Sequence, residues 1–244
     1  MDQISLIAAS GMRANLQSLD LLANNMANTS TNGYKGDSEF HTVFVSEAAD
    51  ESDVEPTTLP MIERHWTDFG QGTLEPTNNP LDFGLTGKGF FAVQGPSGTL
   101  YTRNGSFQMS SSGTLNTKDG YPLLDQNGQP LKLQKPGSPI VVSPDGTVQQ
   151  DGAPIGKLQF VDFKEPDALL KHGGNYFENA TGAKPVTPQD ATVAQGKVET
   201  SNVNAAHGAV RLVNVMRQFE VMQKAISIAN EMGREAIEQV AKIS

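Results

Sequence analysis

The sequence contains no cysteine, and this absence removes several kinds of chemistry. Disulfide bonds, thiolate catalysis and cysteine-ligated zinc sites are all excluded. Aromatic residues make up only 7% of the chain, with a single tryptophan at position 66, and apolar residues only 37%. With 24 glycines and 14 prolines as well, the composition indicates many turns and surface that is completed by neighbouring molecules.

Positive charge is also scarce. The chain has 18 basic and 27 acidic residues, a net charge of −9. Because nucleic-acid affinity comes largely from Lys and Arg, we expect no nucleic-acid partner. No run of about 18 apolar residues is present, which predicts no membrane span. The N-terminus has Asp2 ahead of its first cation, Arg13, so it does not fit a secretory signal and by itself indicates a cytoplasmic protein.

Recognisable catalytic patterns are missing too. The four histidines lie far apart and without the i, i+4 spacing of a zinc-binding helix. The glycine-rich segment 84–89 contains Lys88 but leads into a β-like FFAV run, which favours a turn over a phosphate-binding loop. No GxSxG elbow is present. We therefore expect a non-catalytic protein with no cofactor, metal site or small-molecule substrate.

The last forty residues carry the strongest periodic signal. Positions spaced alternately three and four residues apart lie on one face of a helix. In this region they are, apart from Gly233, all apolar: Leu212, Val215, Phe219, Met222, Ile226, Ala229, Ala236, Val240 and Ile243. The pattern predicts one helix from near Asn204, a suitable N-cap, to near Ile243, about 60 Å long.

The N-terminus carries a matching apolar stripe that ends near Asn28. Its members are Ala9, Met12, Leu16, Leu19, Ala23 and Met26. The two stripes predict that the terminal helices pack together as a coiled coil. Because the C-terminal stripe is about 15 residues longer, neighbouring copies are needed to cover the remainder. The predicted subunit contacts are Met12, Leu16, Leu19, Ala23, Met26, Leu212, Val215, Phe219, Met222, Ile226, Ala229, Ala236 and Val240.

The middle of the chain has the pattern of a β domain. Between residues 70 and 198, short runs of β-forming residues alternate with turn dipeptides such as Asp145-Gly146 and Asp151-Gly152. Segment 46–60 is acidic and carries two prolines, which favours a solvated connector. The predicted fold class is α+β. It comprises an N-terminal helical segment (1–35), a connector (36–69), an antiparallel β-rich domain (70–198) and a C-terminal helix (199–244).

Three segments together resemble the flagellar rod and hook protein family of bacteria. The first is ANNMANTSTNGYK at residues 23–35, the second GKGFFAV at 87–93 followed by YTRNGSF at 101–107, and the third ETSNVN at 199–204. By themselves these residues suit helix ends and turns. The resemblance marks Asn24, Asn25, Asn28, Gly33, Tyr34, Lys35, Ser201, Asn202 and Val203 as family motif positions.

The resemblance implies an architecture and a location. Helices from both chain ends would form an inner tube around an export channel, with the β domain outside. The chain would be exported through the flagellar type III apparatus without a cleaved signal, which replaces the cytoplasmic expectation by the periplasmic rod of the basal body. Expected partners are other copies of the chain, other rod proteins and the export apparatus.

Within the family, the short passage from residue 58 to residue 74 is more similar to the proximal rod subunit, with the distal rod protein as the alternative. Two interpretations from other classes remain open: a periplasmic enzyme with a β domain, and a binding module that dimerises through a coiled coil.

Overall fold

The computed structural model describes residues 3–45, 58–134, 138–166 and 169–243, and these form two compact units. The helical unit contains the described parts of 1–27, 37–66 and 204–244. The β-rich unit contains the described parts of 28–36 and 67–203. The expected α+β class is confirmed, with one helix near each end of the chain and antiparallel sheets between them.

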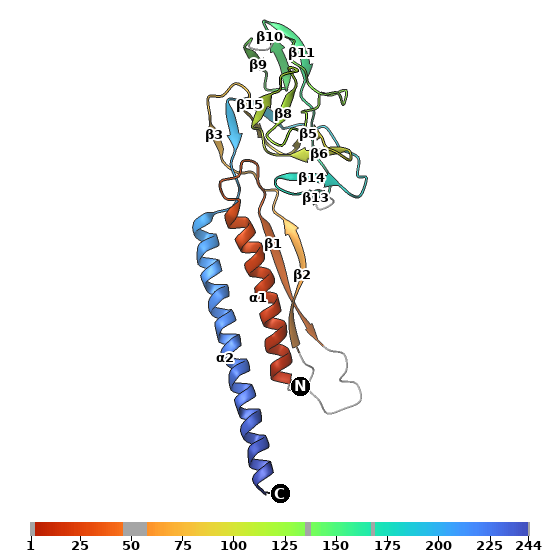
Figure 1. Ribbon diagram of the computed structural model, residues 1–244. Helices are drawn as coiled ribbons and strands as arrows, with labels where there is room; N and C mark the ends of the chain where they lie inside the picture. Colours follow the sequence, from red (N-terminus) through yellow and green to blue (C-terminus); the bar gives the residue numbers. More distant parts are fainter. Residues whose placement is uncertain (1–2, 46–57, 135–137, 167–168, 244) are drawn as a thin grey trace. The chain divides into compact units, whose positions relative to one another are not determined.

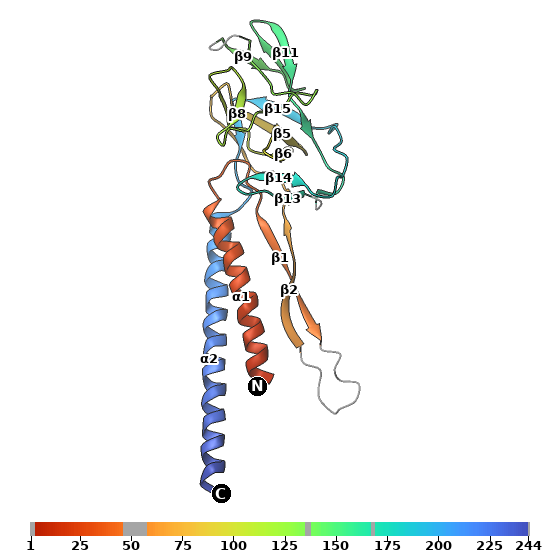
Figure 2. The same ribbon diagram turned by 45° about the vertical axis from the view of Figure 1, so that its right-hand side comes forward.

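The helical unit is built on α1 (Gln3–Ala27) and α2 (Ala205–Ile243), which lie side by side and run in opposite directions (Figure 1). Helix α2 begins at the expected N-cap, since the backbone N–H of His207 donates to Asn204 Oδ1 at 3.0 Å. With 39 residues against 25, α2 continues past the end of α1 (Figure 2). The longer helix therefore has surface that α1 does not cover.

The expected connector at 36–69 is instead largely a two-stranded ribbon. Strand β1 (Asp37–Val45) pairs with β2 (Thr58–Thr67) and contacts α1. The acid residues and prolines of 46–60 suggested a solvated segment, but the β-branched and aromatic residues on either side favour strands. Residues 46–57, which carry all of that charge, lie outside the described residues.

The β-rich unit consists of short strands in several small antiparallel sheets. The largest sheet has the order β12-β5-β6-β14-β13, and a three-stranded sheet has the order β11-β10-β9. Two-stranded sheets pair β15 with β4, β16 with β3 and β7 with β8. The strand bounds are β3 (Leu74–Pro76), β4 (Phe83–Thr86), β5 (Phe90–Gln94), β6 (Thr99–Thr102), β7 (Phe107–Met109), β8 (Leu115–Thr117), β9 (Ile140–Val142), β10 (Thr147–Gln150), β11 (Ala153–Lys157), β12 (Phe160–Val161), β13 (Leu169–Lys171), β14 (Tyr176–Asn179), β15 (Thr192–Gln195) and β16 (Lys197–Glu199).

The turn dipeptides connect these strands as the sequence predicts. Asp151 and Gly152 link β10 to β11, and both have positive φ, at 52° and 79°. This is the backbone of a two-residue hairpin of type I′, for which Asp-Gly is a preferred sequence. The link from β9 to β10 is longer: only Gly146 has positive φ, at 86°, and its N–H donates to the Ser143 carbonyl at 2.8 Å.

Two apolar clusters fill the β-rich unit. The larger gathers side chains such as Phe83, Phe91 and Leu123, and the smaller centres on Phe90 and Phe177. Tyr176 belongs to the larger cluster, and its hydroxyl donates to Asp119 Oδ2 at 2.6 Å. Burial raises the pKa of Tyr176 above its ordinary value of 10.0, and the hydrogen bond to Asp119 adds to this shift.

The raised pKa of Tyr176 predicts an alkaline loss of stability. The contribution of Tyr176 is fully present below pH 10.0 and is lost as the pH rises above that value, because the unfolded chain then releases the phenolic proton first. Tyr176→Phe should reduce the free energy of unfolding by about 1 kcal/mol at pH 7 and flatten its decline above pH 10. Urea titrations from pH 7 to 11 would measure both, and an unchanged alkaline slope would contradict the assignment. Tyr121→Phe, at the neighbouring ring, is the control.

Candidate assembly interface

The face of α1 that is buried within the helical unit lies one position away from the predicted stripe. Its central line is Ala8, Gly11, Asn15, Ser18, Leu22 and Asn25, again spaced three and four apart, and the buried Ala14 lies beside this line. Leu22 is only 4% exposed, and small residues along this face allow close approach of α2 and β1. The prediction from apolar residues alone missed this face because half of its members are polar.

The predicted contact residues on α1 therefore lie beside the buried face. Leu16 and Ala23 are exposed, and Met12, Leu19 and Met26 are partly buried. Met26 lies against α2, since a Cβ added to Gly208 would stand 3.3 Å from its Cγ. Leu16, with 49% of its surface exposed, is a large apolar side chain of this set that is available to a neighbouring molecule.

On α2 the predicted stripe faces α1. Val215 is buried, and Leu212, Phe219, Met222, Ile226 and Ala229 are partly buried. The Met222 sulfur accepts a hydrogen bond from Asn15 Nδ2 at 3.6 Å. The side chains of Ala236 and Val240 lie outside the described ones. The structure thus brings the α2 stripe against α1 for much of its length.

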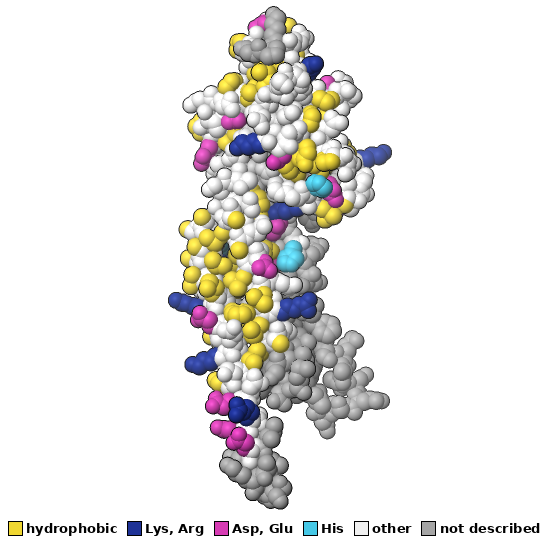
Figure 3. All heavy atoms as spheres, in the orientation of Figure 1, with side chains coloured by type: hydrophobic (Ala, Val, Ile, Leu, Met, Phe, Trp, Pro, Cys, Tyr) yellow, Lys and Arg dark blue, Asp and Glu magenta, His cyan; other side chains and the backbone are white. Residues whose placement is uncertain are grey.

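A second apolar row on α2 faces solvent. It consists of Val210, Val221, Ile228 and Met232, whose spacings of 11, 7 and 4 residues place them on one side of the helix. Val221 is 68% exposed and Met232 is 66% exposed. Figure 3 shows hydrophobic side chains gathered over the helices. The sequence prediction missed this row because Asn214 and Arg217 interrupt it, and a row this exposed is typical of an interaction surface.

A buried carboxylate fixes the β1–β2 ribbon to both helices. Glu39 on β1 accepts from Ser18 Oγ of α1 at 2.8 Å and from Arg211 Nη2 of α2 at 2.7 Å, and its side chain is only 1% exposed. Asn25 of α1 also binds Asp37 of β1 twice, donating to its carbonyl and accepting from its N–H. The two helices and the ribbon therefore form one connected structure.

Removing the Glu39 carboxylate should loosen the ribbon. Glu39→Ala leaves Ser18 and Arg211 without their acceptor, and we expect a loss of about 2 kcal/mol, moderated because Arg211 is partly exposed. Hydrogen exchange would then accelerate in β1 and leave the β-rich unit unchanged. Glu220→Ala, which removes an exposed carboxylate from α2, is the control and should change neither.

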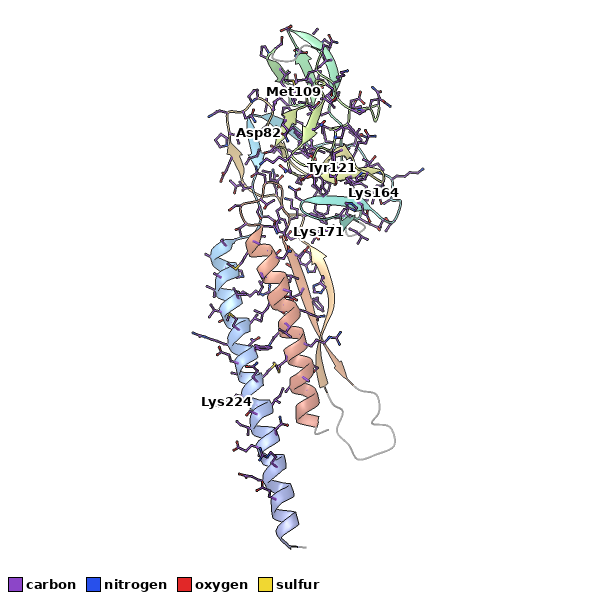
Figure 4. The ribbon with its side chains drawn as sticks, viewed as in Figure 1. Asp82, Met109, Tyr121, Lys164, Lys171 and Lys224 are labelled. Atoms are coloured by element: carbon purple, nitrogen blue, oxygen red, sulfur yellow. The ribbon has the colours of Figure 1, made fainter. Side chains whose placement is uncertain are left out.

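The motif segment after α1 packs within the β-rich unit. Gly33 has φ 69°, and its N–H donates to the Glu199 carbonyl at 2.7 Å. Tyr34 is buried, and the Lys171 ammonium of β13, labelled in Figure 4, lies 4.5 Å from the centre of its ring. The other asparagines of the motif have separate places: Asn24 is exposed on α1, and the Asn28 carbonyl accepts from Thr31 N.

Lys35 belongs to a fully buried cluster of charges. Its ammonium lies 2.5 Å from Glu199 Oε1 and also donates to the Gly70 carbonyl. Arg103 Nη1 donates to Glu199 Oε2 at 3.0 Å. All three side chains are at most 3% exposed. Burial lowers the pKa of Lys35, and the nearby Glu199 carboxylate opposes this shift.

The third motif segment, at 199–204, meets the first. Asn202 Oδ1 accepts from the Gly36 N–H at 2.8 Å, while its amide nitrogen donates to the carbonyls of Asp68 and Gly70. Ser201 Oγ accepts from Val203 N at 3.2 Å. The structure therefore joins motif residues from both ends of the chain, and it adds Arg103 and Glu199, which lie in the quoted segments 101–107 and 199–204 but were not among the family motif positions.

The described part of the chain contains neither a candidate metal site nor a candidate membrane-spanning helix. Among those residues, no group of three or more histidines or carboxylates is placed to hold a metal ion. None of the described helices is long and apolar enough to cross a membrane.

Three family models match successive parts of the sequence. Residues 6–35 match the model described as "Flagella basal body rod protein". Residues 84–150 match the "Flagellar hook protein FlgE/F/G D1 domain". Residues 194–239 match the "Flagellar basal body rod FlgEFG protein C-terminal". These ranges cover most of α1 with its motif, the part of the β-rich unit that contains β5 to β10, and most of α2.

Curated relatives match along nearly the whole chain. The flagellar basal-body rod protein FlgF of Caulobacter vibrioides is 31% identical over 245 residues, covering 100% of both chains. FlgF of Mesorhizobium japonicum is 31% identical, covering 92% of this chain and 94% of its own. The rod protein FlgG of Buchnera aphidicola is 32% identical over 257 residues, covering 93% and 95%. The chain therefore belongs to the flagellar basal-body rod protein family, whose members are structural subunits of the rod.

Proposed function

We propose that this chain is a subunit of the proximal rod, corresponding to FlgF rather than FlgG. The observation that supports this proposal is the length of the alignments with the two kinds of relative. The alignment with the Caulobacter FlgF covers all of both chains in 245 positions, only one more than the 244 residues here. The Buchnera FlgG alignment is 257 positions long although it covers only 93% of this chain, so that relative carries residues that this chain lacks.

We further propose that the subunit is non-catalytic and assembles through its helical unit. The contacts would use the predicted residues that remain accessible, such as Leu16 and Ala23, together with the exposed row Val210, Val221, Ile228 and Met232. Burying each such aliphatic side chain contributes about 1–2 kcal/mol. Assembly with other copies and with other rod proteins would therefore gain its free energy mainly from this unit.

Helices packed in this way would make the rod stiff, and a stiff rod can transmit torque. Close-packed side chains tolerate little displacement, so helices held in a coiled-coil arrangement around the export channel would resist bending and twisting. The Glu39 contacts with Ser18 and Arg211 support this proposal, because they connect the ribbon to both helices. We also propose that the chain reaches the periplasm through the type III export apparatus.

A deletion strain provides the test. If the chain is a proximal rod subunit, basal bodies purified from a strain that lacks it should have no completed rod in electron micrographs, and the wild-type gene should restore rods. Basal bodies that retain the proximal rod and lack only its distal part would favour the FlgG-like alternative. Completed rods in the deletion strain would contradict both.

A further inference from the structure

Glu199 connects parts of the chain that are far apart in sequence. Its carboxylate binds Lys35, which lies 164 residues away, Arg103 at 96 residues and the backbone N–H of Gly72 at 127 residues. Its backbone carbonyl also accepts from the Gly33 N–H. One fully buried side chain therefore holds four separate segments of the β-rich unit together.

The buried charges of Lys35, Arg103 and Glu199 are stable only when the strands that supply their other partners are in place. Two cations share one carboxylate, so further donors need fixed backbone carbonyls, and the buried Arg103 Nε has no hydrogen-bond partner among the described residues. Arg103 donates to the carbonyls of Leu85 and Gly87, and its guanidinium lies 5.5 Å from the centre of the Phe90 ring. Before β4 and β5 are in place, these partners are absent and burial of the charges is unfavourable.

The contacts within the β-rich unit also close chain segments of very different length. Strands β5 and β6, and likewise β10 and β11, are neighbours in sequence and pair across short turns. The contact between Lys35 and Glu199 closes a loop of 164 residues. Because the entropy lost on closing a loop increases with its length, local pairings form before distant ones.

We propose that the contacts of Glu199 with Lys35 and Arg103, here called the latch, are the last to form when the β-rich unit folds. The local pairings β5–β6 and β10–β11 form first, and β14 then pairs with β6. Glu199 then inserts between Lys35 and Arg103, and this step joins segment 33–36, which follows α1, to segment 199–202, which precedes α2. The unlatched state has an ordered β core, but the two segments are free of each other. This inference concerns the single chain and does not depend on the proposed place in the rod.

Pulse-labelling hydrogen exchange on the refolding wild-type chain tests the order directly. The reporters of the latch are the amides of Gly33, Gly72 and Thr200, whose acceptors are Glu199 or Thr73. Core amides such as Ala92 and Leu131 provide the comparison. The latch amides should gain protection at least tenfold more slowly than the core amides. Simultaneous protection of the two groups, or earlier protection of the latch, would overturn the proposal.

Kinetics of a full-length variant give an independent measurement. Glu199→Gln leaves two buried cations without a carboxylate, so unfolding of the β-rich unit should be about 100-fold faster while refolding stays within about twofold of wild type. Glu178→Gln removes an exposed carboxylate of β14, paired with His172, and should change neither rate. A Glu199→Gln chain that unfolds at the wild-type rate but refolds slowly would contradict late closure. If this variant does not fold, the labelling of the wild-type chain still decides.

Discussion

Gly33→Ala is expected to prevent the motif segment from docking in the β-rich unit. A Cβ at this position would lie 2.2 Å from the backbone nitrogen of Asn104 and 2.3 Å from the carbonyl carbon of Arg103. Backbone atoms cannot rotate away as a side chain can, and the φ of 69° adds strain for any L-residue other than glycine. We expect a loss of about 3 kcal/mol or more in the free energy of unfolding.

Gly128→Ala is a control that separates the effect of backbone strain at positive φ from the effect of steric overlap with the added Cβ. Gly128 has φ 73°, nearly the same as Gly33, but an added Cβ would meet nothing within 4 Å. This control should lose only about 1 kcal/mol. Urea titration of both variants, followed by near-ultraviolet circular dichroism, makes the comparison. Equal losses in the two variants would show that the close approach to residues 103 and 104 does not matter.

Phe219→Asp should abolish rod assembly while leaving the β-rich unit folded. Phe219 is on the α2 stripe that faces α1 and is partly buried there. A carboxylate at this position would lose the apolar contact and would have to be desolvated, an effect of about 2–4 kcal/mol on helix pairing. Hydrogen exchange in the β-rich unit should remain at wild-type rates, because residue 219 belongs to the other unit.

Gln223→Asp is the matched control, since it places the same carboxylate on an exposed position of α2, away from the row that contains Val221 and Ile228. A strain with Gln223→Asp should swim and form complete rods, and one with Phe219→Asp should do neither. Normal motility with Phe219→Asp would contradict the claim that rod assembly requires α2 to pair with α1.

The sequence predicted the elements whose signals are local. The stripe from Leu212 to Ala229 specified α2 because a spacing of three and four has no other simple structural meaning. Asp151-Gly152 specified a hairpin because few other dipeptides adopt two positive φ angles. Asn204 was predicted as the N-cap, and its side chain accepts from His207 N.

Features that depend on distant partners were not predictable in this way. Asn15, Ser18 and Asn25 are buried on α1 because Met222, Glu39 and Asp37 supply their partners, and apolar periodicity gives polar residues no weight. The ribbon at 37–45 and 58–67 was missed because the charge of the segment between its strands dominated the prediction. The Glu199 cluster could be recognised only once positions 35, 103 and 199 were known to be adjacent.

In the proposed assembly, neighbouring rod subunits cover the apolar surface of the terminal helices. The absence of native cysteine allows a direct test, because a single cysteine at Val221 or Ile228 is a unique reporter. In the purified monomer these thiols should react rapidly with a maleimide, since both positions are exposed. In purified basal bodies they should be protected at least tenfold, while a cysteine at Gln223, an exposed position on another side of α2, reacts in both states. Equal reactivity at Val221 and Ile228 in monomer and basal body would contradict the account.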